Sequence, residues 1–90
     1  SINKHTLETY YKKWKGNFGE KYDEGLNYLI SEYQAEGIQD PPLDTNEHED
    51  IVLIGFFTED EIIVVATYNK SKNEFSIDWP EFRRSIEEHR

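Results

Sequence analysis

The sequence predicts an α+β fold: one domain in which a three-stranded antiparallel meander packs with three helices, in the order α-α-β-β-β-α. Two segments with helical periodicity come first, and two runs rich in β-branched and aromatic residues follow before a last helical segment. Ninety residues sustain only one core, because a chain of this size buries ~60 % of its unfolded surface. We therefore expect residues 1–90 to form a single acidic domain.

Two helices are predicted at the N-terminal end, at about residues 5–15 and 18–36. Asn17 and Glu20 have the spacing of a capping box at the start of the second helix, and Gly37 is a natural stop after it. Each helix has one apolar face, formed by Leu7, Tyr10, Tyr11 and Trp14 in the first and by Tyr22, Leu26, Leu29, Ile30 and Tyr33 in the second. The short link at Gly16 predicts that the two helices pack as a hairpin.

Residues 38–50 are predicted to be a long loop. They show no periodicity, and Pro41-Pro42 forbids a helix. Loops of this length in compact domains are usually functional or disordered, so this segment is the first place to look for activity.

Three strands are predicted, at about residues 51–57, 62–68 and 74–78. Four polar residues join the first two strands as a hairpin, and residues 69–73 form the second turn. The first two runs are apolar on both faces, so both faces of the sheet need cover. We expect helices of the same chain to supply it; a second copy or a partner on one face is the alternative.

A third helix is predicted at about residues 79–89. Asp78 is a suitable N-cap, Pro80 is tolerated in the first turn, and Glu81 completes the capping box. Trp79, Phe82 and Ile86 are expected to point inward.

The charge of the chain is strongly acidic and unevenly distributed. Its 19 acids and 10 bases give a net charge of -9, and residues 16–69 hold thirteen acids but only one base, Lys21. Such a surface favours association with basic proteins and disfavours direct binding of nucleic acid, whose phosphates repel carboxylates.

Several chemistries are excluded or disfavoured. The sequence has no cysteine, which removes disulfides, thiolate metal sites and cysteine nucleophiles, and suits the cytoplasm. No apolar run reaches the length of a membrane span. The best metal candidate, Glu47-His48-Glu49-Asp50, has neighbouring side chains that point apart, and an EF-hand counted from Asp44 lacks the required Gly and Glu. No nucleophile elbow or phosphate-binding glycine loop is present. We predict no cofactor, no metal and no enzymatic activity.

The sequence thus predicts a protein that binds and inhibits a basic protein partner, such as a toxin, a nuclease or another nucleic-acid-handling protein. Immunity proteins and inhibitors that imitate nucleic acid work in this way, through carboxylates that accept hydrogen bonds from Arg and Lys. The predicted contact residues are Glu32, Glu36, Asp40, Asp44, Glu47, Glu49 and Asp50, with Glu59, Asp60 and Glu61 as a second choice.

The hairpin-tip acids Glu59, Asp60 and Glu61 form a separate group from the loop acids. Seven strand residues separate Asp50 from Thr58, a distance of ~23 Å along a strand. The loop and the hairpin tip should therefore lie at opposite ends of the sheet. Two alternatives stay open. The acids serve only solubility, or the chain is a structural or accessory domain of a larger assembly, including a homo-oligomer, that associates through an apolar sheet face.

Overall fold

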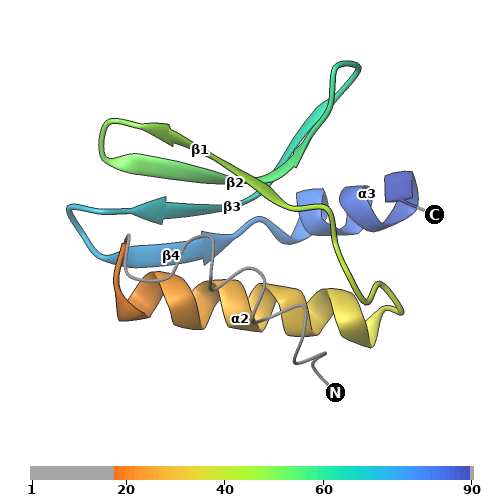
Figure 1. Cartoon of the computed structure of the whole chain (residues 1–90), viewed down its shortest axis with the longest axis horizontal. Coiled ribbons are helices and arrows are strands. Elements are labelled where there is room, and N and C mark those ends of the chain that lie inside the picture. Colours follow the sequence, from red (N-terminus) through yellow and green to blue (C-terminus); the bar gives the residue numbers. More distant parts are fainter. Residues whose placement is uncertain (1–17, 90) are drawn as a thin grey trace. The chain divides into compact units, whose positions relative to one another are not determined.

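The computed structural model describes residues 18–89, and these residues form an α+β fold with two helices and a four-stranded antiparallel sheet (Figure 1). The elements are α2 (Glu20–Ala35), β1 (Asp44–His48), β2 (Ile51–Phe57), β3 (Ile62–Asn69), β4 (Glu74–Ile77) and α3 (Trp79–His89). The helix predicted at residues 5–15 lies outside the described residues. The chain divides into two compact units, Ser1–Pro41 and Pro42–Arg90. The first unit contains α2, and the second contains the sheet and α3.

Helix α2 ends as predicted but begins differently. Ile38 N–H donates to the carbonyl of Tyr33 and Gly37 N–H to that of Gln34, both at 3.0 Å, while Gly37 has a φ of 90°. This pair of bonds is a Schellman motif, in which glycine adopts the left-handed conformation at no steric cost. The predicted capping box is wrong, because Gly19 is the N-cap and no side chain caps the helix. The predicted apolar face is confirmed as buried: Tyr22, Leu26, Leu29, Ile30 and Tyr33.

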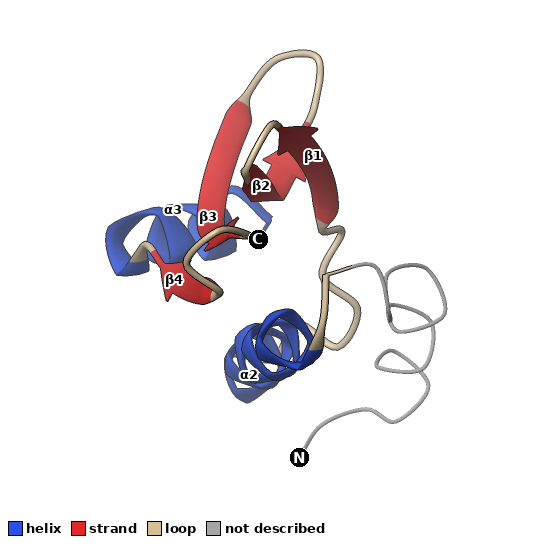
Figure 2. Ribbon diagram, turned by 90° about the vertical axis from the view of Figure 1, so that its left-hand side faces the viewer, coloured by secondary structure: helices blue, strands red, loops and turns tan. Residues whose placement is uncertain are grey.

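The prediction of a loop over residues 38–50 is wrong for its second half, where β1 forms. β1 pairs antiparallel with β2, with Asp44 opposite Gly55 and His48 opposite Ile51. Every residue of β1 is polar, so the hydrophobic pattern gave no sign of a strand. An exposed edge strand of this kind gains its stability from backbone hydrogen bonds to its single neighbour. The predicted three-stranded meander therefore has four strands, in the order β1-β2-β3-β4 (Figure 2).

The predicted bounds of the other strands are close: β2 is confirmed, β3 extends one residue further to Asn69, and β4 ends one residue earlier at Ile77. A β-bulge interrupts the β2–β3 pairing. Ile54 faces Ala66 while Gly55 faces Val64, so Val65 is an extra residue in β3. Because the bulge shifts the alternation by one, the consecutive residues Val65 and Ala66 are both buried.

The bulge explains much of the apolar run in β3, and alternation assigns the rest of the sheet to two faces. The inner face is buried and is formed by Val52, Ile54, Phe56, Ile63, Val65, Ala66 and Tyr68. The outer face carries Ile51, Leu53, Phe57, Ile62 and Val64, which keep part of their surface exposed. We expected both faces of the sheet to be covered, but only the inner face is fully buried.

Helix α3 confirms its predicted bounds and Asp78 as its N-cap, but the predicted capping box is wrong in its second half. The Asp78 N–H donates to the Val65 carbonyl at 2.8 Å, and the Glu81 carboxylate binds Arg84 instead. Asp78 Oδ1 accepts a hydrogen bond from Glu81 N–H at 3.1 Å, and the helix packs against β3 with Phe82 and Ile86 buried. The prediction that Trp79 points inward is wrong, because 43 % of this residue is exposed. Its ring lies edge-on to that of Phe82, with the centroids 5.4 Å apart.

Candidate protein-binding surface

The predicted carboxylates lie in three places in the structure. Three belong to the first unit, on α2 or just after it: Glu32, Glu36 and Asp40. Four belong to β1 and its turn: Asp44, Glu47, Glu49 and Asp50. The last three, Glu59, Asp60 and Glu61, form the β2–β3 tip, which lies at the opposite end of the sheet from the Glu49-Asp50 turn (Figure 1). The predicted separation of loop and tip holds for the Glu49-Asp50 turn and is wrong for Asp44, which lines a hollow together with Glu59.

The antiparallel register changes the grouping within this set. Asp44 begins β1 and lies opposite Gly55, so it is closer to the hairpin tip than to the Glu49-Asp50 turn. Asp44 and Glu59 line the same hollow on the outer face of the sheet. The structure thus joins one carboxylate of the predicted loop with one of the predicted tip, two groups that the sequence had kept apart.

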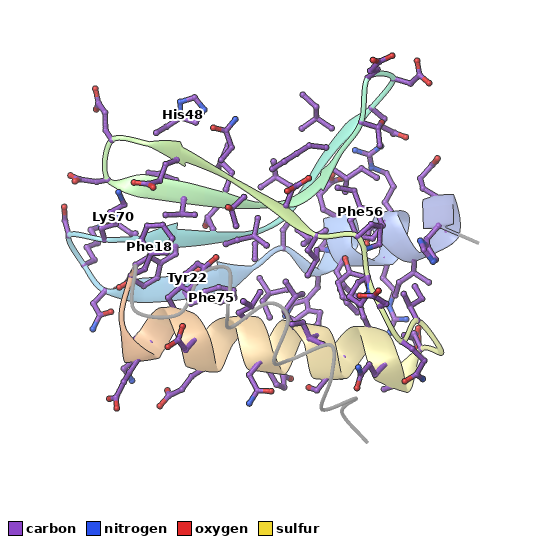
Figure 3. The ribbon with its side chains drawn as sticks, viewed as in Figure 1. Phe18, Tyr22, His48, Phe56, Lys70 and Phe75 are labelled. Carbon is purple, nitrogen blue, oxygen red and sulfur yellow. The ribbon has the colours of Figure 1, made fainter. Side chains whose placement is uncertain are left out.

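Some predicted contact residues are engaged by other groups of the chain. Glu47 forms an ion pair with Lys70, which sits at the turn end of the sheet (Figure 3). Glu61 forms an ion pair with Arg84 of α3, and Glu32 accepts a hydrogen bond from the Tyr28 hydroxyl at 3.3 Å. Arg84 also binds Glu81 at 2.9 Å, and this hydrogen bond holds the pKa of the Glu81 carboxyl below its ordinary value.

Other carboxylates point to solvent. Glu59 and Asp60 at the tip, and Glu49 and Asp50 at the turn, are exposed and form no ion pair with another described residue. The two pairs are held on tight turns. The turn between β1 and β2 has only two residues, and Glu49 adopts a φ of 53° there. Within the second unit, these four members of the predicted contact set therefore lie at the two ends of the sheet.

The hairpin tip is braced from the inner side by α3. Residues 56–63, which we call the distal hairpin, turn away from the rest of the sheet beyond the bulge (Figure 1). Thr58 closes the turn, since its N–H donates to the Glu61 carbonyl at 2.9 Å. The Phe56 ring points to α3 and lies edge-on to the His89 ring at 6.2 Å (Figure 3), and Arg84 binds Glu61. These contacts connect α3 to the hairpin that carries Glu59 and Asp60.

The hollow on the outer face, which we call the outer hollow, runs along β1 to the hairpin tip and has a volume of about 620 Å³. Its apolar floor is formed by Leu53, Phe57 and Ile62, and Asp44 and Glu59 stand at its rim. Ile62 is 65 % exposed, which is unusual for a large aliphatic residue in a strand. The hollow therefore combines an apolar surface with negative charge.

Two other hollows lie within the second unit. One of about 550 Å³ lies where β4 gives way to α3 and includes Thr67, Ser76 and Trp79. The other, about 290 Å³, lies between the distal hairpin and the end of α3 and includes Phe56 and His89. Within residues 18–89, no group of three or more His, Asp and Glu side chains is arranged to hold a metal ion. Nor is either described helix long and apolar enough to cross a bilayer.

Comparisons with protein-family models, with curated proteins and with solved structures give no significant match for this chain. Sequence reasoning found Asp44 and Glu59 but missed the apolar floor between them, formed by Leu53, Phe57 and Ile62. The sequence signal for this floor was that β2 and β3 are apolar on both faces, so that the outer face also carries hydrophobic residues.

Proposed function

We propose that this chain is a non-enzymatic acidic protein that binds a basic protein partner and inhibits it. The observation that carries the proposal is the pair Glu59 and Asp60. These exposed carboxylates stand at the end of a braced hairpin and form no ion pair with another described residue. Charge placed in this way is available to Arg and Lys of a partner.

Electrostatics support the choice of a basic partner. The chain carries a net charge of -9, so its long-range field attracts cationic surfaces and repels nucleic acid and other polyanions. Complementary charge raises the association rate between proteins to as much as ~10⁸–10⁹ M⁻¹s⁻¹ at low salt. A protein that must capture a harmful partner before it reaches its target benefits most from such a rate.

The contacts between α3 and the distal hairpin support an inhibitor in particular. Because α3 holds the distal hairpin through Arg84–Glu61 and Phe56–His89, little conformational entropy is lost when the tip meets a partner. Carboxylates presented on a fixed hairpin can occupy the groove in which a nuclease or toxin binds phosphates. We expect this interaction to take place in the cytoplasm, in keeping with a sequence without cysteine.

The test is affinity capture from an extract of the source cell at low and at high salt. The bait is the full chain, compared with a Glu59→Lys/Asp60→Lys variant and with a Glu74→Lys/Glu87→Lys control that has the same net charge at exposed sites away from the tip. We expect the wild type and the control to retain a basic protein at low salt and release it at high salt, and the tip variant to lose it.

The captured protein is then assayed for its own activity with and without the chain. Loss of that activity on addition of the wild type, and not of the tip variant, supports inhibition. Capture that is indifferent to salt and to both double substitutions would remove the electrostatic basis of the proposal.

A second candidate function is that of a structural or accessory domain that associates through the outer face of the sheet. The observation that favours it is the exposure of Ile62 together with the partly exposed Leu53 and Phe57. Light scattering distinguishes the two functions. An oligomer that resists high salt favours the structural role, whereas a monomer favours the inhibitor.

A further inference from the structure

The outer hollow differs from the rest of the acidic surface in having an apolar floor. Leu53 and Phe57 of β2 and Ile62 of β3 share one face of the sheet, because Phe57 lies directly opposite Ile62 and Leu53 is four residues before Phe57. These apolar side chains do not contribute to solubility, unlike the carboxylates around them. A charge-only contact would have no use for this floor, and burying it would release about 25 cal/mol per Å².

The rim of the hollow determines which kind of occupant fits. Asp44 stands at one side and Glu59 at the tip, and Asp60 lies next to Glu59. A second copy of the chain would bring its own acidic rim against this one, which costs free energy through like-charge repulsion. A nucleic acid would meet the same repulsion. A positively charged polypeptide would be attracted, so charge complementarity selects a basic protein segment.

We infer that the outer hollow binds a segment of the basic partner in which a branched aliphatic side chain lies between arginines or lysines. The aliphatic side chain packs on Leu53, Phe57 and Ile62, and the flanking cations bind Asp44 and Glu59 at the rim. This inference rests on the proposed function and specifies the partner's chemistry. The volume of about 620 Å³ lies within the ~300–1,000 Å³ of typical ligand pockets and admits one such side chain with its neighbours.

The two parts of the site have different roles. Carboxylates at the rim steer the encounter and set the association rate, which falls with salt. The apolar contact is short-ranged and acts after docking, so it lowers the dissociation rate and is insensitive to salt. The basic charge of the segment thus determines how fast it is captured, and its aliphatic residue determines how long it stays.

The experiment uses three synthetic peptides and the full chain labelled with ¹⁵N for NMR titration. The first peptide has a leucine between two pairs of arginines, the second replaces that leucine with serine, and the third replaces the arginines with glutamates. We expect the leucine peptide to bind about tenfold more tightly than the serine peptide, since a buried aliphatic side chain contributes roughly the free energy of a tenfold change. Its amide shift changes should centre on Leu53, Phe57 and Ile62, and the glutamate peptide should not bind.

The variant Ile62→Thr removes part of the floor while keeping a β-branched residue at an exposed position, so the fold is retained. It should abolish the advantage of the leucine peptide and leave the serine peptide unaffected. A matched control is Tyr28→Gln, at another exposed large side chain, which should change neither affinity. If both arginine peptides bind equally at the carboxylates, the inference fails and the proposed function stands. If neither arginine peptide binds at low salt, the proposed function fails as well.

Discussion

Gly55 of β2 lies so close to β3 that a β-carbon on it would overlap the backbone carbonyl oxygen of Ile63. The close approach coincides with the bulge, at which Val65 is the extra residue of β3. Beyond this point the distal hairpin turns away from the rest of the sheet, and the outer hollow lies along its exposed side. The direction of the distal hairpin therefore depends on the absence of a side chain at position 55.

The first prediction concerns Gly55→Ala. The added methyl group meets backbone rather than a movable side chain, so the strands must separate or the bulge must shift. We expect a loss of about 1–3 kcal/mol in the free energy of unfolding, seen as a lower midpoint in urea denaturation. An unchanged midpoint would show that the two backbones are not in the described contact.

The second prediction concerns the brace between α3 and the distal hairpin. Arg84→Lys keeps the charge but loses the planar guanidinium that binds Glu61 and Glu81 together. We expect faster amide hydrogen exchange at the hairpin tip, near Glu61, without global unfolding. Arg83→Lys, at the neighbouring exposed position, is the control and should leave these rates unchanged. Equal exchange in the two variants would mean that Arg84 does not brace the tip.

The third prediction concerns acid sensitivity of the same contact. The hydrogen bond from Arg84 lowers the pKa of Glu81 below the ordinary value of 4.5. The stabilisation is therefore present above that ordinary value and is lost as the pH falls through the lower value of the folded state. The protection of amides at the start of α3, taken relative to the intrinsic exchange rate at each pH, should fall over this acidic range in the wild type. The Glu81→Gln variant should lack this dependence, and a dependence equal to that of the wild type would contradict the assignment.

The fourth prediction concerns alkaline pH. Burial raises the pKa of Tyr22 above its ordinary value of 10.0, and the neighbouring Asp23 raises it further. The folded state thus holds the Tyr22 proton more tightly than the unfolded state, and stability should decline as the pH rises above about 10. Tyr22→Phe should flatten this decline in urea midpoints. Tyr28→Phe should flatten it much less, because Tyr28 is exposed to solvent, although Glu32 also raises its pKa. If stability declines as steeply in Tyr22→Phe as in the wild type, another titrating group causes the decline.

The fifth prediction concerns the Glu49-Asp50 turn. Glu49 has a φ of 53°, a conformation that costs a residue with a β-carbon about 1–2 kcal/mol and glycine almost nothing. We expect Glu49→Gly to stabilise the chain by about 0.5–1 kcal/mol in thermal unfolding. Asp50→Gly, the adjacent control without a positive φ, should destabilise it. Equal effects of the two substitutions would exclude the proposed strain.

The elements that the sequence predicted best are those with clear signals at their ends. Polar residues flank the apolar run of β2, Asp78 caps the start of α3, and Gly37 marks the end of α2. β1 was missed because Asp44–His48 has no apolar residue, and its pairing with β2 is decided by backbone hydrogen bonds alone. Local patterns cannot reveal such a strand.

The candidate surface was predictable only in its charge. The tip acids Glu59 and Asp60 are evident from sequence, but their grouping with Asp44 requires the β1–β2 register. The ion pairs of Glu47 and Glu61 join residues 23 positions apart, so they too depend on the tertiary structure. The apolar floor is visible in sequence only as an excess of hydrophobic residues in β2 and β3.

The proposed function requires that the carboxylates of the distal hairpin capture a basic protein. Its most direct test is the association rate constant between the chain and the captured partner, measured by stopped flow at low and at physiological salt. We predict that the wild-type rate falls at least about tenfold with added salt, and that the Glu59→Lys/Asp60→Lys rate is lower at low salt and falls less steeply with salt. Equal rates for the wild type and this variant at low salt would contradict the claim.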